Sequence, residues 1–373
     1  MRICVLQHVF DPHKGANHLP LYAANAEITF IVVCSICKIQ QSTLPSNVRV
    51  ITIPRWTGPY YYGCMDLRFA RMVLSLHPTT DPFWQTFDIV HCNQIMGPAL
   101  RQLRKTGVPL LLFIHHPVTA DLEVALQESR GLERFLWRMK YALLVPWQRK
   151  MCHAASRIAT VSETMRGRIA EDYAYDPHKI FIVPNGVDGS VFSPDPAAPL
   201  FDVIALGSFI HPRKGFRYLV EAYRSLSAKG FRIADVGRRS DAQVAVLRSI
   251  PGVTIHGTVD QEAVQRLIQR SSVLLSTALY EGFGLSLIEA LACGRPAFAF
   301  GGGAVLEVLS PIDTELVVPV RDTSALVAKA EAFLRLSDTE RKQRGEQYRK
   351  GVLAHYGIQQ AADALRRLYT EMT

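Results

Sequence analysis

Two features are missing from this sequence of 373 residues: a long apolar run and a secretory leader. No apolar stretch approaches the roughly 18 residues that a membrane-spanning helix needs. The start "MRICVLQHVF" has one Arg and a short apolar run without a small-residue cleavage site. We therefore expect a cytoplasmic protein that is at most peripheral, at the inner face of a membrane.

Cysteine is scarce, and one common metal-binding motif is absent. The seven cysteines, an odd number scattered through apolar segments, suit buried thiols in a reducing compartment. Cys34 and Cys37 form the only CxxC pair, and no second pair completes a zinc site. No Asp-x-Asp occurs, so a metal that clamps a diphosphate would have no obvious ligand pair. The sequence predicts no metal site.

Positive charge is concentrated in the first half. Of the net charge of +9, residues 1–186 carry +7, from 20 Lys and Arg against 13 Asp and Glu. No helix-turn-helix, RNA-binding aromatic or paired-cysteine pattern accompanies these residues, so nucleic acid is not expected as a partner. An anionic small substrate or an anionic membrane surface explains the charge.

Short apolar runs alternate with helix-period segments along the whole chain. The strand-like runs are residues 2–9, 28–36, 48–54, 88–94, 109–116 and 157–162, then 201–208, 231–237, 253–259, 272–277, 295–300 and 315–320. Such alternation is typical of parallel sheets covered by helices on both faces. We predict an α/β fold with two Rossmann-like, doubly wound domains.

The domain boundary is expected where Pro, Gly and Asp break the pattern, in residues 184–202. This gives a first domain over 1–186 and a second over 187–355. Residues 356–373 read as an amphipathic helix that packs back on the first domain. If the two domains face each other, the carboxyl ends of both sheets meet in one cleft.

The stretch "YEGFGLSLIEALACGRPAFAFGGG" sets two glutamates, Glu281 and Glu289, in apolar surroundings. It reads as a loop followed by a helix with Gly294 just past its end. Gly282 and Gly284 let backbone N–H groups approach an anion at the positive helix N-terminus. Carboxylates would repel a phosphate, so we expect the glutamates to accept hydrogen bonds from hydroxyls, as on a sugar. The alternative is a helix-end charge and a salt-bridged surface residue.

Glu281 and Glu289, with seven residues between them, resemble the E-x7-E motif of glycosyltransferase family 4, which has the GT-B fold. Six further segments resemble family motifs in family order. They are "FIHHP" (113–117), "ATVSE" (159–163), "VPNGVD" (183–188), "RKGF" (213–216), "GGGAVLE" (301–307) and "LVVPVRD" (316–322). The resemblance implies a nucleotide-sugar co-substrate, linked to UDP or GDP, and no separate cofactor.

The resemblance also implies how the donor is held. Glu281 would hold hydroxyls of the donor sugar, while Phe283, Gly284 and Leu285 would offer backbone N–H groups to the sugar or the diphosphate. Lys214 would neutralise the diphosphate.

The remaining donor contacts implied by the resemblance lie elsewhere in the chain. Glu289 would bind the ribose hydroxyls, and Val259 lies where the family's nucleobase loop usually lies. His115 would touch the donor sugar from the first domain, although a core histidine is the alternative. Gly15 would belong to the loop that closes over the phosphates.

Two departures from the family pattern concern the phosphate clamp and the N-terminal loop, where one glycine and a short segment with Pro20 stand in place of paired glycines and a long helix. Ser208 stands where the family usually has an arginine, and Arg213 is the candidate to replace it. The acceptor side is assigned to His116 and to the aromatic residues Trp56, Tyr60 and Tyr61, in a stretch that also carries Arg55, Arg68 and Arg71. Rings beside cations suit a membrane interface, a sugar, or simple packing inside the domain.

The predicted function is a retaining, metal-independent glycosyltransferase that moves a sugar from a nucleotide-sugar donor to an acceptor hydroxyl. A lipid-linked or otherwise amphipathic acceptor is favoured over a small soluble one. Two alternatives stay open: a GT-B nucleotide-sugar 2-epimerase, which would turn over without an acceptor, and a non-catalytic nucleotide-sugar-binding partner.

Overall fold

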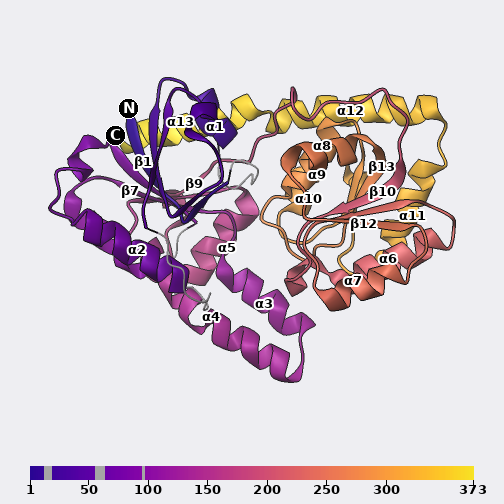
Figure 1. Cartoon of the computed structure of the whole chain (residues 1–373), viewed down its shortest axis with the longest axis horizontal. Helices are drawn as coiled ribbons and strands as arrows, with labels where there is room; N and C mark the ends of the chain where they lie inside the picture. The colour runs from indigo at the N-terminus through magenta and orange to yellow at the C-terminus, as the bar shows by residue number, and fades with distance from the viewer. Residues whose placement is uncertain (12–18, 55–63, 95–96) are drawn as a thin grey trace. The chain divides into compact units, whose positions relative to one another are not determined.

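The computed structural model describes residues 1–11, 19–54, 64–94 and 97–373 (Figure 1). The chain divides into two units. The first contains Met1–Leu126, Arg130–Asn185 and Gln359–Thr373, and the second contains Gln127–Ser129 and Gly186–Ile358. The second unit is thus inserted between the body of the first unit and its last helix.

A parallel sheet of seven strands forms the centre of the first unit, in the order β5-β3-β1-β6-β7-β8-β9. The strands are β1 (Arg2–Leu6), β3 (Thr29–Cys34), β5 (Val48–Thr52), β6 (Ile89–Asn93), β7 (Leu110–Ile114), β8 (Arg157–Thr160) and β9 (Ile180–Ile182). Two short strands, β2 (Val9–Phe10) and β4 (Ile36–Cys37), pair separately. The six strands predicted for this half are confirmed, whereas β2, β4 and β9 are too short to leave a pattern.

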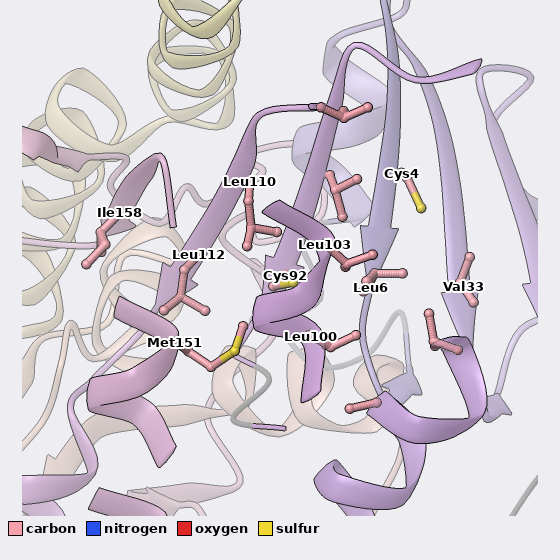
Figure 2. Close-up of a cluster of buried hydrophobic side chains, with 14 of the residues drawn as sticks. Cys4, Leu6, Val33, Cys92, Leu100, Leu103, Leu110, Leu112, Met151 and Ile158 are labelled. Atoms are coloured by element: carbon pink, nitrogen blue, oxygen red, sulfur yellow. The ribbon is translucent and has the colours of Figure 1, made fainter. Parts of the chain in front are cut away.

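Helices cover this sheet and close its core. They are α1 (Leu19–Ala24), α2 (Cys64–Leu76), α3 (Val118–Glu128), α4 (Gly131–Cys152) and α5 (Glu163–Tyr173), with the 3₁₀ segment η4 (Pro98–Thr106). Figure 2 shows one core cluster, in which strand residues such as Leu6, Cys92 and Leu112 pack with Leu103 of η4 and Met151 of α4. The near-continuous apolar strands reflect a sheet that is buried on both faces.

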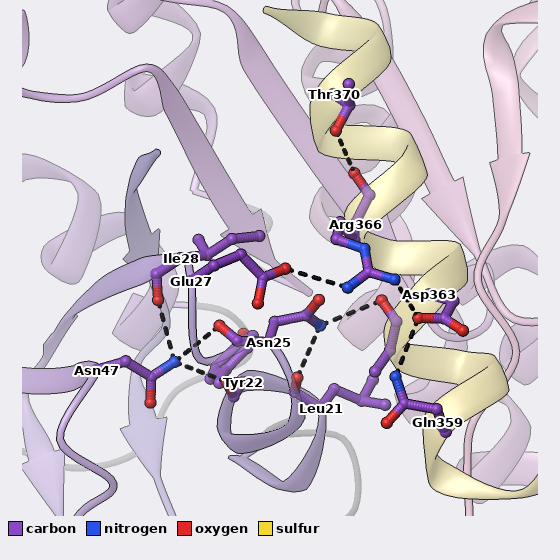
Figure 3. Close-up of polar contacts among 11 residues, drawn as sticks. Leu21, Tyr22, Asn25, Glu27, Ile28, Asn47, Gln359, Asp363, Arg366 and Thr370 are labelled. Carbon is purple, nitrogen blue, oxygen red and sulfur yellow. Dashed lines mark hydrogen bonds and ion pairs between the residues drawn. The ribbon is translucent and has the colours of Figure 1, made fainter.

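The last helix, α13 (Ile358–Met372), belongs to the first unit (Figure 3). The Asn25 side chain donates to Ala362 O at 3.1 Å, and Arg366 lies 3.2 Å from a Glu27 carboxylate oxygen. The Tyr369 hydroxyl lies 2.7 Å from Nδ1 of the buried His91 on β6. These contacts join residues more than 270 positions apart in sequence.

The second unit has a parallel sheet in the order β12-β11-β10-β13-β14-β15. The strands are β10 (Phe201–Leu206), β11 (Ile233–Val236), β12 (Val253–Gly257), β13 (Ser271–Ser276), β14 (Ala297–Phe300) and β15 (Val317–Val318). The six predicted strands are confirmed. The helices are α6 (Phe216–Ser227), α7 (Asp241–Arg248), α8 (Gln261–Gln269), α9 (Leu285–Ala292), α10 (Val305–Leu309), α11 (Thr323–Leu334) and α12 (Asp338–Tyr356).

In both sheets the order in which successive strands are added reverses once. Counted in chain order, the second sheet runs 3-2-1-4-5-6, so its switch point lies between β10 and β13. In the first unit the switch point lies between β1 and β6. Ligands of doubly wound folds bind outside the carboxyl ends of the strands at such points. Within the described ranges, no helix is both long and apolar enough to cross a membrane.

Candidate active site

The loop between β13 and α9 carries Glu281 at the switch point of the second unit. Its backbone is fixed by the residues after β14: Glu281 N donates to Gly302 O at 3.3 Å, and Ala304 N donates to Glu281 O at 2.9 Å. A Cβ at Gly302 would lie 2.1 Å from Leu279 O, and one at Gly303 would lie 2.2 Å from Glu281 O. The glycines of "GGGAVLE" are therefore required for the close approach that sets the position of Glu281.

Two cations hold the Glu281 carboxylate. Lys214 Nζ contacts Oε1, and Arg213 Nη1 lies 3.3 Å from Oε2 and donates to Tyr280 O at 3.2 Å. The three side chains are between 15% and 19% exposed. Two positive charges against one negative charge give these three partly buried side chains a net charge of +1, which favours an anionic ligand.

The loop after β10 brings these cations to Glu281. After Gly207, the 3₁₀ turn η6 (Pro212–Lys214) is capped by the His211 side chain, whose ring nitrogen accepts from Arg213 N at 3.2 Å. Gly215 follows at φ +68°, and a Cβ there would lie 2.2 Å from Thr277 O. The loops after β10 and β13 are thus pressed together across the switch point, which places Lys214 beside Glu281.

Helix α9 begins directly after this loop. Gly284 adopts a left-handed conformation at φ +92°, which turns the chain into the helix at Leu285, and Gly294 follows its end at φ +71° as predicted. The Phe283 side chain is buried, with its ring 5.2 Å from that of Tyr356. The backbone of residues 282–285 therefore lies at the positive end of a helix dipole.

Glu289 lies one turn into α9, in a different environment from Glu281. Burial raises the pKa of its carboxyl to about 7, although a hydrogen bond from Gln261 acts in the opposite direction. Gln261 is the first residue of α8, two positions after Val259. The loop that carries Val259 therefore leads directly to the residue that contacts Glu289.

Sequence reasoning missed Arg239, which follows β11 near Ser208. Its side chain is only 1% exposed and pairs with the buried Asp235 at 2.6 Å. It also donates to Gly207 O at 2.6 Å and lies over the Phe209 ring at 4.4 Å. This arginine fixes the loop that leads to Lys214. The signal was a lone aspartate inside the apolar run "FRIADVG", since a buried carboxylate needs a partner.

A hydrogen-bonded amide network lies at the switch point of the first unit. His115 follows β7, with its Nε2 3.0 Å from Asn93 Oδ1, and Asn93 Nδ2 donates to Gln7 Oε1 at 3.0 Å. Because the Asn93 oxygen faces the ring, His115 Nε2 carries the proton in this network. The backbone N–H of His115 donates to the Gln94 side chain at 2.7 Å. The ring is buried and its orientation is fixed.

His116 points elsewhere and pairs with Asp121 on α3, 3.0 Å from its carboxylate. A cavity of about 340 Å³ lies between α2 and residues that follow β1, β3 and β5. It is lined by His8, Ser35, Pro54, Met65, Arg68, Phe69, Arg71, Met72 and Ser75. Gly15, Trp56, Tyr60 and Tyr61 lie outside the described residues.

Two family descriptions match the chain, "Glycosyltransferase Family 4" over residues 22–191 and "Glycosyl transferases group 1" over residues 201–336. The chain is 31% identical to the MMP alpha-(1->4)-mannosyltransferase of Mycolicibacterium hassiacum, over 74% of its own length and 68% of that protein. The chain belongs to glycosyltransferase family 4. It is therefore a glycosyltransferase of GT-B fold.

Other relatives of this family 4 protein agree. It is 27% identical to the phosphatidyl-myo-inositol mannosyltransferase of Mycobacterium leprae, over 67% of its own length and 64% of the relative, so the match spans slightly less than two thirds of that protein. The sucrose-phosphate synthase structure from Thermosynechococcus elongatus covers all of the chain and 98% of its own, with a TM-score of 0.79 at 19% identity. The predicted GT-B fold is confirmed.

Proposed function

We propose that this protein is a retaining, metal-independent hexosyltransferase that uses a UDP- or GDP-linked sugar and an acceptor hydroxyl. The observation that carries the proposal is the Glu281 carboxylate held by Lys214 and Arg213 at the switch point of the second unit. A carboxylate for sugar hydroxyls and two cations for a diphosphate are the groups that a nucleotide sugar needs side by side.

The diphosphate is neutralised by the protein itself in this proposal. Lys214 and Arg213 together exceed the charge of Glu281, and the N-terminal end of α9 adds partial positive charge nearby. Arg213 takes the part of the arginine that Ser208 replaces. The sequence has no Asp-x-Asp to hold a bridging metal.

Glu281 orients the donor sugar and does not attack it. A carboxylate paired with two cations is a poor nucleophile, because attack would separate it from both partners. The acceptor oxygen instead forms its bond to the anomeric carbon on the side from which the diphosphate leaves. The departing phosphate oxygen takes the acceptor proton, and the configuration is retained. His115 contacts the donor sugar.

Mannose is the proposed sugar, since two of the three proteins named above are mannosyltransferases. The proposed acceptor is amphipathic, because the cavity beside α2 combines Arg68 and Arg71 with apolar Phe69 and Met72. One relative's name specifies a phosphatidyl-myo-inositol acceptor. Glu289 and the loop carrying Val259 hold the ribose and base.

The test is release of nucleoside diphosphate from UDP- and GDP-hexoses, with and without phosphatidylinositol as acceptor and with EDTA present. We expect acceptor-dependent release from a mannose donor, unchanged by EDTA, and an α-linked product by NMR. A β-linked product would contradict retention. An obligatory divalent metal would contradict the charge argument, and a 2-epimer formed without acceptor would favour the epimerase.

A further inference from the structure

Helix α4 of the first unit exposes a row of large apolar side chains. Leu132, Phe135, Leu136, Met139 and Leu143 are between 46% and 73% exposed. Their spacing of three, one, three and four residues puts them on one side of the helix, and we call this row the α4 ridge. The opposite side of α4 is buried from Tyr141 onward, through residues such as Leu144 and Met151, whereas residues 131–136 are exposed on every side. The ridge is therefore a contiguous apolar surface, and such surfaces mark contacts with a membrane or a partner.

Basic residues accompany the ridge. Helix α4 carries Arg134, Arg138, Lys140, Arg149 and Lys150, against Glu133 as its only acidic residue. Lys140 lies over the Trp137 ring at 4.5 Å from its centroid. An apolar row flanked by cations is the pattern of helices that lie in a membrane interface.

A cationic groove adjoins the C-terminal end of α4. It has a volume of about 460 Å³ between α2, η4 and α4, and its charged lining residues are Arg71, Arg101 and Lys150. None of its described lining residues is acidic. Lys150 follows Leu143 by two helical turns, so it continues the line of the ridge. The groove can therefore receive an anionic group from the surface on which the ridge rests.

We propose that the α4 ridge docks on a lipid bilayer and that the groove takes an anionic lipid headgroup. This extends the proposed function by naming the surface at which an amphipathic acceptor is met. A second copy of the chain fits less well. A symmetric contact would place the same basic helix on both sides, and nearly all of its charges would repel. A bilayer with anionic headgroups supplies the opposite charge and the apolar layer together.

Flotation of the full chain with vesicles tests the proposal. Vesicles of phosphatidylcholine alone, and with 30 mol% phosphatidylglycerol, are compared at low and high salt. We expect the wild type to float with the anionic vesicles and to dissociate partly at high salt. The double variant Phe135→Ser and Met139→Ser should bind more than tenfold less. Arg101→Gln and Lys150→Gln should each cost about fivefold.

Matched controls separate docking from general effects. Leu306, on α10 of the second unit, is 54% exposed, the same as Met139, so Leu306→Ser should float like the wild type. Arg248→Gln, at the exposed end of α7, is the charge control. The docking surface would be overturned if the double variant Phe135→Ser and Met139→Ser, the ridge variant, floated as well as the wild type. It would also be overturned if the wild type stayed in solution. A dimer that dissociates in the ridge variant, without flotation of the wild type, would assign the ridge to a second copy.

Nucleoside diphosphate release is measured on the same preparations without vesicles, with phosphatidylinositol dispersed in detergent as the acceptor. Wild-type release by the ridge variant shows that its donor site is intact. If the protein turns over a nucleotide sugar but never floats, the docking surface is rejected and the proposed transferase function stands. If it floats through the α4 ridge but releases no nucleoside diphosphate, the transferase function is rejected and the docking surface stands.

Discussion

Different kinds of interaction hold the residues at the two switch points. In the second unit, glycines bring backbone segments into contact, and ionised side chains face each other, as with Glu281 and Lys214. In the first unit, neutral side chains hold one another in the series Gln7, Asn93 and His115. The difference fits the proposed roles, in which the second unit holds a diphosphate that is the same for many donors and His115 contacts the sugar, which varies. Charge and backbone are fixed where the ligand is constant.

The comparison predicts that the largest loss follows from removing a charge in the second unit. Lys214→Ala leaves the diphosphate with one cation fewer at a partly buried position, so turnover should fall about 100- to 1000-fold. Lys229→Ala is the matched control, because Lys229 pairs with Glu331 at an exposed position away from the switch point. Initial rates with and without EDTA check this. A greater effect of EDTA than of Lys214→Ala would assign neutralisation to a metal.

The two glutamates should separate sugar from nucleotide. Glu281→Gln removes a hydrogen-bond acceptor for the sugar but leaves Lys214 and Arg213 without their carboxylate. Turnover should fall, while affinity for free nucleoside diphosphate stays unchanged or tightens slightly. Glu289→Ala should weaken the nucleoside diphosphate itself, by about 1 to 3 kcal/mol. Calorimetric titration measures both, and equal losses in the two variants would refute this division.

The same comparison explains how much the sequence could predict. Strands buried on both faces appear as apolar runs, so twelve strands and helix α9 could be located from pattern alone. Glu281 and Lys214 could each be picked out from motifs that stand after β13 and β10, but their pairing is seen only in the structure. These motifs contain glycine because a side chain would block close contacts such as that of Gly215 with Thr277 O. The loops after β10 and β13 can therefore be recognised in a single sequence.

The rest depends on tertiary contacts that leave no periodic signal. The pair of Asp235 with Arg239 forms only when the loops after β10 and β11 meet. The network of Asn93 joins three neighbouring strands through ordinary polar residues. Helix α4 carries apolar residues on two sides, and only the fold decides that the side of Tyr141 and Leu144 is covered and the α4 ridge is exposed. These features needed the structure.

A pH dependence should distinguish the two glutamates more finely. The pKa of Glu289 is raised from its ordinary 4.5 to about 7 by burial. Ribose hydroxyls need an ionised carboxylate, so affinity for nucleoside diphosphate should fall about tenfold as the pH drops from 8 to 6. Glu289→Gln should show only the titration of the ligand's own phosphate. An identical pH profile in the variant would remove Glu289 from the ribose site.

Protein stability provides an independent check of that pKa. The folded protein favours the neutral form of Glu289, so this group's contribution is full below about pH 4.5 and is lost as the pH rises through 7. The stability of Glu289→Gln minus that of the wild type should therefore be larger at pH 8 than at pH 5. Thermal unfolding at the two pH values measures the difference.

The smallest effect should come from the neutral network of the first unit. Asn93→Ala removes the oxygen that accepts from His115 Nε2, so the ring loses its fixed orientation. One neutral hydrogen bond corresponds to about 1 kcal/mol, and turnover should fall about fivefold without a change in nucleoside diphosphate affinity. Asn47→Ala is the matched control, since Asn47 donates to the backbone carbonyls of Tyr22, Asn25 and Ile28 (Figure 3). It should lower the melting temperature and leave turnover intact. If Asn93→Ala instead weakens nucleoside diphosphate binding as much as Glu289→Ala does, the first unit helps to hold the nucleotide, and the contrast between the two switch points fails.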